Sequence, residues 1–168
     1  MFAAERERIF DPGPRYVGHE LWTTQPGDYH TLPHEGEGRA LVRDAQGLRL
    51  MSNVCRHRQA LMLRGRGHTR EHVVCPIHRW TYGLDGKLVG APHFESDPCL
   101  HLNTYPLHRW QGLLFDDRGR DVRTALRACS ATAALDFSGY VLDRIEQHEC
   151  DYNWKTFIEV YLEDYHVG

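Results

Sequence analysis

Two short pairs of cysteine and histidine constrain this chain more than any other feature. One residue separates Cys55 from His57, two residues separate Cys75 from His78, and seventeen residues lie between the pairs. Each spacing lets a tight loop direct both side chains to one point. Thiolate and imidazole ligands bind either zinc or a [2Fe–2S] cluster. A zinc finger usually pairs Cys with Cys and His with His. The mixed pairs found here suit a cluster with two Cys on one iron and two His on the other.

The composition permits one ordinary domain and a further fragment. The chain has 168 residues, of which 41% are hydrophobic, and its formal net charge is −3. That charge, without a long basic run, gives no indication of nucleic-acid binding. A short basic stretch is predicted to form an exposed hairpin that carries Arg64, Arg66, His68, Arg70 and His72. The alternative interpretation is a docking patch for an acidic electron donor.

The five cysteines do not suggest a disulfide framework, because their number is odd and they are widely spaced. Beyond the two pairs, Cys99, Cys129 and Cys150 are predicted to be buried free thiols, which fits a reducing cytoplasm. The N-terminus is charged and has no apolar signal-peptide core. No apolar run approaches the ~18 residues that suggest a membrane span. We therefore expect a cytoplasmic protein that does not contact a membrane.

Short strands separated by turn residues predict a small, mainly β domain. A helix is expected over residues 3–10, ended by the sequence Asp-Pro-Gly-Pro that follows it. Strands are then expected at 29–32, 40–43, 48–52, 73–74, 80–82, 87–90, 102–108 and 112–115. The aromatic residues predicted to lie in the core are Trp80, Tyr82, Trp110 and Phe115. For Tyr82 the alternative is a hydrogen bond that tunes a cluster, since such bonds raise its potential.

The composition changes after these strands. The further predicted elements are a helix or linker at 124–135, a strand at 140–150 and a helix at 153–165. On the last helix the spacing of Glu159 and Glu163 is expected to put both carboxylates on one face, with His166 close behind. By itself this spacing describes an acidic amphipathic helix that ends in an ordinary histidine.

The two loops that carry the Cys and His pairs resemble the Rieske domain of ring-hydroxylating oxygenase alpha subunits. The residues shared with that family are Asn53, Cys55, His57, Arg58, Cys75, Pro76, His78, Trp80, Thr81, Tyr82, Asp85 and Gly86. The family usually has Gly where this chain has Gln59 and Arg79, and Tyr where it has Ile77. None of these three positions is a ligand.

The resemblance also implies a fold and a division of the chain. It implies a mainly β protein, with a Rieske domain of small antiparallel sheets and an N-terminal helix, followed by the first strand and helix of an α+β catalytic domain. The predicted divisions are a lead-in at 1–38, the Rieske [2Fe–2S] domain at 39–123, and a linker with the start of the catalytic domain at 124–168.

For the cofactors, the resemblance implies that Cys55, His57, Cys75 and His78 hold the [2Fe–2S] cluster. The later motif, preceded by a family-like Asn-Trp-Lys sequence, resembles part of the family's mononuclear Fe(II) site. It implies that His166 binds this iron. Glu163 is implied to join the cluster of one subunit to the iron of the next, in a homotrimer or larger ring, and the adjacent, shorter Asp164 is the alternative for this bridge.

For the reaction, the resemblance implies that a ferredoxin or flavin reductase supplies electrons. The iron would activate O2 to hydroxylate or demethylate a small organic substrate, as mono- and dioxygenases of aromatic hydrocarbon catabolism do. The second His and the carboxylate expected of the iron site are not found in this sequence, so the chain alone is expected to be inactive as an oxygenase. The alternatives are a stand-alone Rieske-type ferredoxin and a zinc module without redox activity.

Overall fold

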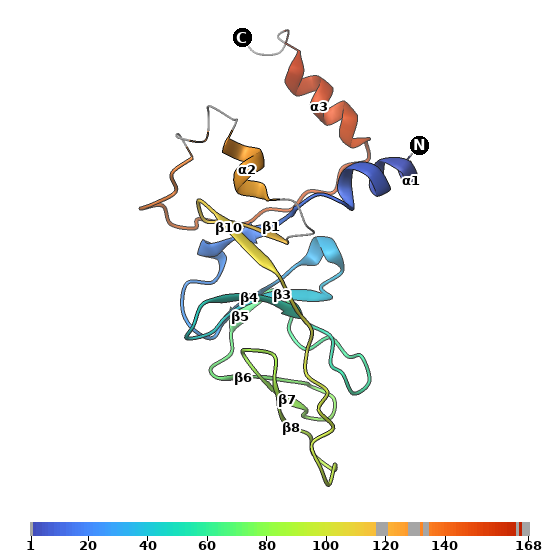
Figure 1. The fold of residues 1–168 in the computed structure, drawn as a ribbon, viewed down its shortest axis with the longest axis vertical. Coiled ribbons are helices and arrows are strands. Elements are labelled where there is room, and N and C mark those ends of the chain that lie inside the picture. The colour runs from blue at the N-terminus through green and yellow to red at the C-terminus, as the bar shows by residue number, and fades with distance from the viewer. Residues whose placement is uncertain (1, 117–120, 128–131, 133–134, 164, 166–168) are drawn as a thin grey trace.

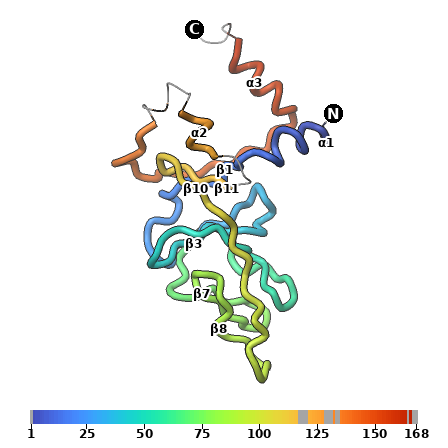
Figure 2. Tube along the Cα trace, viewed as in Figure 1, coloured from blue at the N-terminus to red at the C-terminus, as the bar shows by residue number. Residues whose placement is uncertain are grey.

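Three small antiparallel sheets are stacked along the long axis of the molecule, and short helices lie beyond one end of the stack (Figure 1). The computed structural model describes residues 2–116, 121–127, 132, 135–163 and 165. The trace in Figure 2 shows both ends of the chain on the helical side, with the sheet of β6, β7 and β8 at the opposite end. The predicted mainly β fold is confirmed.

The central sheet has five strands in the order β5-β2-β3-β4-β9. These strands are β2 (Asp28–Thr31), β3 (Arg39–Arg43), β4 (Leu48–Ser52), β5 (Arg66–His68) and β9 (Thr104–Tyr105). β3 and β4 form a hairpin in which Leu41 pairs with Leu50. Both leucines are fully buried with Val17, Leu32 and Leu114 in one of two apolar clusters. This cluster joins the central sheet to the third sheet, whose strands contain Val17 and Leu114.

The end sheet consists of β6 (His72–Val74), β7 (Thr81–Gly83) and β8 (Leu88–Gly90). Its residues share the second apolar cluster with β3 and β4, since Val73 and Tyr82 are buried together with Val42 and Met51. The same cluster contains both cysteines of the ligand pairs and Trp80. Trp80 and Tyr82 are core residues as predicted, whereas Trp110 and Phe115 are only partly buried.

The third sheet has the order β1-β11-β10. Its strands are β1 (Arg15–His19), β10 (Leu107–Trp110) and β11 (Leu113–Asp116). The single strand predicted at 102–108 is divided into β9 and β10 by Pro106, which has no N–H to donate to a ladder. Arg39 ties this sheet to the central one, because it donates hydrogen bonds of 2.6 Å to Asp116 and to Glu35. Glu35 lies in η3 (Pro33–Glu35).

The basic stretch predicted as a hairpin is not one. β5 pairs with β2 of the central sheet, and β6 pairs with β7 of the end sheet. β5 and β6 therefore belong to different sheets, and the segment between them crosses from the central sheet to the end sheet. All the arginines and histidines of this stretch are exposed, as predicted.

The helices lie at the two ends of the sequence. α1 (Phe2–Glu5) continues into the π-helical turn η1 (Arg6–Phe10) and ends before Pro12, as expected. η2 (Glu20–Trp22) follows β1, and α2 (Val122–Arg127) falls within the predicted helix or linker region. None of the helices in the described part of the chain is long and apolar enough to span a membrane.

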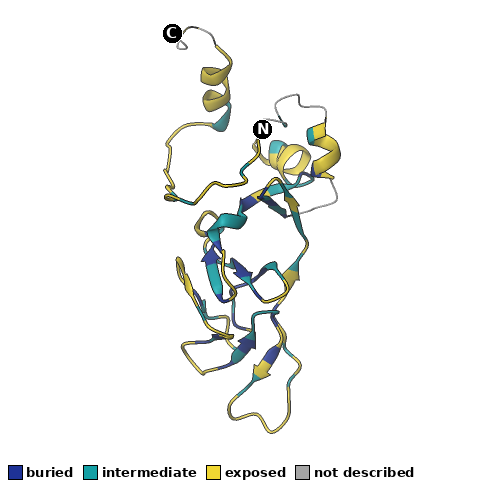
Figure 3. Ribbon diagram, turned by 90° about the vertical axis from the view of Figure 1, so that its left-hand side faces the viewer, coloured by how far each residue is buried: buried dark blue, intermediate teal, exposed yellow. Residues whose placement is uncertain are grey.

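The C-terminal part differs from the prediction in two respects. The strand predicted at 140–150 is wrong, because this segment is irregular and mostly exposed, and no described strand pairs with its backbone. α3 (Trp154–Leu162) confirms the predicted helix but ends before Glu163, whose ψ of 138° is extended. Glu159 and Glu163 therefore do not share a helix face. Figure 3 shows that this region is mostly exposed, with partly buried residues at the start of α3, whereas the buried residues lie mainly in the sheets.

Candidate metal centre

The two loops that carry the Cys and His pairs have the same backbone hydrogen-bond pattern. In the first loop, the N–H of Cys55 donates to the carbonyl of Ala60 at 2.9 Å, and Gln59 donates back to Cys55 at 2.9 Å. The second loop repeats both bonds, from Cys75 to Trp80 at 2.8 Å and from Arg79 to Cys75 at 3.1 Å. The loops thus form two equivalent supports for their cysteines.

The equivalence explains two residues that depart from the family pattern. Gln59 and Arg79 occupy the same place in the two loops, and their φ angles are 57° and 61°. Glycine adopts this left-handed conformation without steric cost, whereas other residues pay about 1–2 kcal/mol. The loop shape requires a positive φ at both positions, which explains the family's usual Gly. In this chain Gln59 and Arg79 adopt the same φ at a steric cost.

Asn53 fixes the entry to the first loop. Its side chain is 1% exposed and donates to the carbonyls of Glu37 at 2.8 Å and Leu63 at 2.9 Å, while its oxygen accepts from the N–H of Leu63 at 2.8 Å. These three bonds close the segment 53–63 over the central sheet. The sequence identified Asn53 only as a shared motif residue. Its clamping role depends on partners far along the chain.

The cysteines and histidines of the pairs differ in burial. Cys55 and Cys75 are 1% and 2% exposed within the apolar cluster. His57 is half-buried and His78 is exposed, and their ring centroids lie 4.7 Å apart. The loops therefore place two thiols inside the protein and two imidazoles together at its surface. This arrangement matches a two-iron cluster whose Cys-bound iron is internal and whose His-bound iron is external.

His57 carries the strongest sign of a missing bonding partner. Its Nδ1 is buried and has no hydrogen bond to any described residue. A buried polar atom without a partner costs free energy, so such atoms are rare and call for an explanation. Partial burial, together with the charges of His78 and Arg58, lowers the pKa of His57. The imidazole is thereby kept neutral, which is the form that binds metal. The donor set fits a [2Fe–2S] cluster.

Aromatic rings hold the His57 imidazole in place. Trp80 stacks on it with a centroid distance of 4.9 Å and an interplanar angle of 6°. Phe94 meets the His57 ring edge-on at 6.0 Å and Trp80 at 5.1 Å. No sequence pattern indicated Phe94, because it lies in an irregular loop and reaches the site only through the fold.

Tyr82 makes the hydrogen bond that was considered for it. Its hydroxyl lies 3.5 Å from Sγ of Cys55 and accepts a bond of 3.1 Å from the N–H of Arg56. Since the phenol oxygen accepts from the backbone, its O–H is available for donation to the sulfur. Burial and the neighbouring thiol raise the pKa of Tyr82, so the hydroxyl keeps its proton.

A single-metal site of the zinc type is not found among the described residues. No three His, Cys, Asp or Glu side chains in that part of the chain converge on one ion. The two imidazoles lie together with ring centroids 4.7 Å apart, and both thiols are buried in one apolar cluster, a division that suits two irons of which one has Cys and the other His ligands. Of the remaining cysteines, Cys99 and Cys150 are free thiols as predicted, but the prediction that they are buried is wrong, because both lie in irregular, exposed segments outside the sheets. Cys129 lies outside the described residues.

The second motif is represented only in part. Asn153 caps α3 by accepting a 2.9 Å bond from the N–H of Lys155. The helix start is tied to the N-terminal helix, because Lys155 pairs with Glu5 and Trp154 meets Phe10 edge-on at 5.2 Å. His166 and Asp164 lie outside the described residues. Glu163 is placed immediately after the helix, and no ligand set for an iron ion is assembled in the described region.

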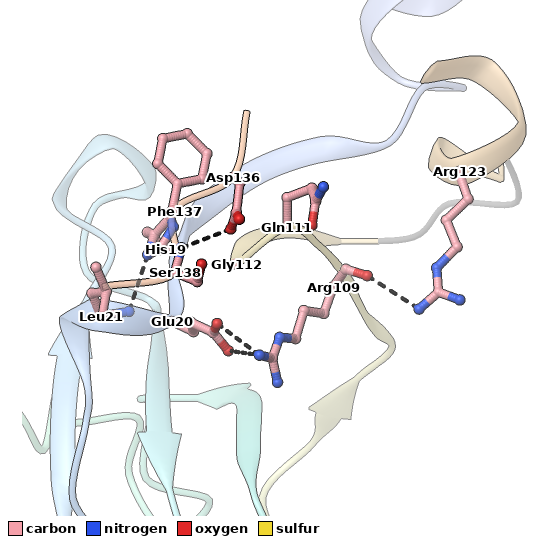
Figure 4. Close-up of a pocket in the computed structure, with 10 residues that line it drawn as sticks. All are labelled: His19, Glu20, Leu21, Arg109, Gln111, Gly112, Arg123, Asp136, Phe137 and Ser138. Atoms are coloured by element: carbon pink, nitrogen blue, oxygen red, sulfur yellow. Dashed lines mark hydrogen bonds and ion pairs between the residues drawn. The ribbon is translucent and has the colours of Figure 1, made fainter. Parts of the chain in front are cut away.

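A separate cavity of about 410 Å³ lies where residues 136–138 approach the third sheet (Figure 4). Its charged groups are largely paired with one another, since Arg109 contacts the carboxylate of Glu20 at 2.6 Å and Arg123 donates to the carbonyl of Arg109 at 3.4 Å. The ring of Phe137 covers His19 at 5.3 Å. These contacts attach residues 136–138 to the third sheet.

The fold and the site together define an iron–sulfur electron carrier built on small antiparallel sheets. The family model described as "Rieske [2Fe-2S] domain" matches residues 16–106. The chain belongs to the Rieske [2Fe–2S] family, and its cofactor is a [2Fe–2S] cluster.

Several known proteins are similar over nearly the whole chain. A putrescine 2-hydroxylase of Ralstonia nicotianae is 60% identical over 167 residues, which are 99% of this chain and 45% of the relative. A putrescine 2-hydroxylase of Bordetella bronchiseptica is 49% identical, with 99% and 42% covered. The crystal structure of a quaternary ammonium Rieske monooxygenase in complex with an inhibitor superposes with a TM-score of 0.79 at 29% identity, with 99% and 50% covered. The chain thus spans about half the length of the proteins it matches, and it corresponds to the N-terminal part of a Rieske oxygenase alpha subunit.

Proposed function

We propose that Cys55, His57, Cys75 and His78 hold the [2Fe–2S] cluster, and that this chain is the electron-carrying part of an amine hydroxylase. The observation that supports the ligand assignment is the pair of equivalent loops with two buried thiols beside the unpartnered Nδ1 of His57. The bound cluster would supply one-electron chemistry. In this chain an apolar cluster surrounds Cys55 and Cys75. Trp80 and Phe94 orient the imidazole of His57, and Tyr82 donates a hydrogen bond to Sγ of Cys55.

The proposed substrate is an aliphatic amine. Two relatives similar over 99% of this chain are named putrescine 2-hydroxylase, and the structural relative is a quaternary ammonium monooxygenase. These names favour a cationic amine over the aromatic hydrocarbon expected from the wider oxygenase family. A diamine such as putrescine, hydroxylated on carbon by O2, is the specific substrate we propose for the complete enzyme.

A mononuclear Fe(II) site is proposed for the complete enzyme, with His166 as one of its ligands. The motif spacing after α3 supports this, although His166 lies outside the described residues. Glu163 is proposed to bridge His57 or His78 of one subunit and His166 of its neighbour, in a homotrimer or larger ring. A carboxylate can accept the N–H groups of two imidazoles and so fix both rings. The placement of Glu163 beyond the helix end leaves its side chain independent of the α3 face.

Two further proposals concern the electron donor and the cellular location of the protein. A ferredoxin or flavin reductase is proposed as the electron donor, and a cytoplasmic location fits the exposed free thiols Cys99 and Cys150. The stand-alone ferredoxin alternative does not explain the capped helix α3, for which an electron carrier has no need.

The complete enzyme tests the substrate proposal directly. With a reductase and O2 supplied, we expect NADH-dependent hydroxylation of putrescine, and slower or no turnover of carnitine and benzene. Turnover of benzene without turnover of either amine would contradict the proposal. In the same enzyme, Glu163→Gln is expected to leave reduction of the cluster unchanged while its reoxidation by O2 and substrate becomes far slower. Asp164→Asn is the matched variant. A loss with Asp164→Asn alone would move the bridge by one residue.

A further inference from the structure

The positive charge of this chain is concentrated around the metal centre. Residues 56–79 contain six arginines and one glutamate, although the whole chain has a formal net charge of −3. All six side chains are exposed: Arg56, Arg58, Arg64, Arg66, Arg70 and Arg79. A concentration of one sign of charge on an otherwise acidic protein attracts and orients a partner of the opposite sign.

These arginines differ from most others in the molecule, which are used internally. Arg39 binds Glu35 and Asp116, Arg49 binds Asp44, and Arg109 binds Glu20. For the six arginines of 56–79, no ion pair is found within the described ranges. Their guanidinium groups therefore remain available for an external carboxylate.

The six arginines form two groups. Arg56, Arg58 and Arg79 belong to the ligand loops and form the tip, beside the two imidazoles. Arg64, Arg66 and Arg70 form the edge, on and next to β5, which is the outermost strand of the central sheet. The tip and the edge are thus separate faces of one basic region.

The edge is rigid although it is exposed. Thr31 donates to the carbonyl of Gly65 at 2.8 Å, and Thr69 donates to the carbonyl of Gly27 at 2.8 Å, so both ends of β5 are fixed to the strand β2 region. Gly67 lies so close to the ring of Tyr29 that an added Cβ would be 2.7 Å from its hydroxyl. The backbone positions from which the three arginine side chains project are therefore fixed, so that no backbone segment has to be ordered when a partner binds.

The edge also leads directly to the metal centre. The exposed segment begins after Leu63 and ends before Val73, and both of these residues are buried in the same apolar cluster as Cys55 and Cys75. β6 runs from His72 to Val74 and continues into Cys75. The two ends of the edge segment are therefore anchored, through Leu63 and Val73, in the apolar cluster that surrounds Cys55 and Cys75.

We propose that the edge formed by Arg64, Arg66 and Arg70 is the docking surface for an acidic [2Fe–2S] ferredoxin, either free or as a domain of a reductase. This inference rests on the proposed function. Electron transfer there moves one electron from the donor, which is oxidised, to the cluster, which is reduced, and no bond is made or broken. The tip, beside His57 and His78, remains available to face the neighbouring subunit. In this proposal electrons enter the cluster from the edge, on the side of Cys55 and Cys75, and leave it on the side of the two imidazoles.

The experiment uses the complete enzyme with its cluster bound, and an acidic plant-type [2Fe–2S] ferredoxin, photochemically reduced, as the probe. The bimolecular rate of cluster reduction is measured by stopped flow at increasing ionic strength. For the wild type we expect the rate to fall steeply with salt. The variant R64E/R66E/R70E should react about 100-fold more slowly at low salt and lose the salt dependence, since steering changes association rates by roughly 10–1,000-fold.

Two variants with the same change of charge serve as controls. R8E/R123E/R127E alters three exposed arginines remote from the ligand loops, and we expect its rate to stay within about threefold of the wild type because salt screens charges beyond about 8–10 Å. R56E/R58E/R79E alters the tip, and its reduction rate should fall much less than that of the edge variant. The milder variant R64Q/R66Q/R70Q should give an intermediate rate.

The outcomes separate this inference from the proposed function. A wild-type rate in the edge variant, or a larger loss in the tip variant, would overturn edge docking. The electron paramagnetic spectrum and the equilibrium midpoint potential should be unchanged in the edge variant, which shows that the centre is intact. If the wild type itself had no Rieske signal, the proposed function would fail before docking was tested.

Discussion

The metal-centre domain and the C-terminal segment are stabilised in different ways. In the domain, Cys55, Cys75, Trp80 and Tyr82 are almost completely buried in a cluster shared by two sheets. In α3 no residue is buried, and its apolar side chains include Tyr161 at 74% exposed. The domain is therefore shaped by its own packing, whereas α3 depends on its Asn153 cap and on the contacts of Lys155 and Trp154 with the N-terminal helix. The described residues therefore include the side chains proposed to hold the [2Fe–2S] cluster. The ligands of a mononuclear iron site are not assembled among the described residues.

The largest expected effect is the loss of the cluster when one of its proposed Cys ligands is replaced. Cys75→Ser should abolish the visible iron–sulfur absorption and most of the bound iron, because the thiolate is both ligand and charge partner of the iron. Cys99→Ser alters an exposed free thiol outside the ligand loops and should have wild-type iron content and absorption. Equal iron content in both variants would show that Cys75 is not a ligand.

A core substitution should distinguish the two regions by stability. Leu41→Ala in β3 is expected to lower the free energy of unfolding by about 2–5 kcal/mol, because it opens a cavity in a fully buried cluster. Ile158→Ala in α3 should change it by less than about 0.5 kcal/mol, since that side chain is already 42% exposed. Denaturant titrations of the two variants measure both values. Comparable losses would mean that α3 contributes to the same cooperative core.

Removing the hydroxyl of Tyr82 should change the redox potential without removing the cluster. Tyr82→Phe is expected to lower the midpoint potential by roughly 20–60 mV, because a hydrogen bond worth about 0.5–1.5 kcal/mol is lost and 59 mV corresponds to about 1.4 kcal/mol for one electron. The matched change Tyr105→Phe removes a hydroxyl from β9, outside the ligand loops, and should leave the potential unchanged. A potential in Tyr82→Phe equal to that of the wild type would show that the phenol does not donate to Sγ of Cys55.

The smallest expected effect concerns the backbone of the two loops. Gln59→Gly or Arg79→Gly should raise the free energy of unfolding by up to about 1 kcal/mol, since glycine relieves the left-handed strain but adds unfolded-state entropy. Arg58→Gly removes a side chain at a neighbouring position without a positive φ and should be neutral or destabilising. Thermal melts of the cluster-loaded variants compare the three. A loss of stability in both left-handed variants would contradict the assigned conformation.

The sequence predicted the features that depend on local spacing. The four proposed ligands, the short strands β2 to β4 and β6 to β8, and the helix α3 could be anticipated because turns, alternation and helical periodicity are local signals. The strand predicted at 140–150 failed because a β-strand requires a partner, and alternation alone does not supply one. Glu163 was assigned to a helix face by counting residues, although the helix ends one residue before it.

Other features could not be read from spacing because they arise from tertiary packing. The difference between His57 and His78 depends on Trp80 and Phe94, which reach only one of the two imidazoles among the described ring contacts. The clamp formed by Asn53 depends on Glu37 and Leu63. The basic stretch could be noticed in the sequence, but the place of its arginines along the outermost strand of the central sheet follows from the pairing of β5 with β2.

Electron paramagnetic resonance of the reduced protein, combined with metal analysis after anaerobic purification, tests the central claim most directly. We predict two irons per chain, a signal with the low average g value of a Rieske centre, and a midpoint potential between roughly −150 and +300 mV, above that of all-Cys plant-type clusters. Zinc without iron, or a signal and potential typical of an all-Cys cluster, would contradict the assignment of Cys55, His57, Cys75 and His78.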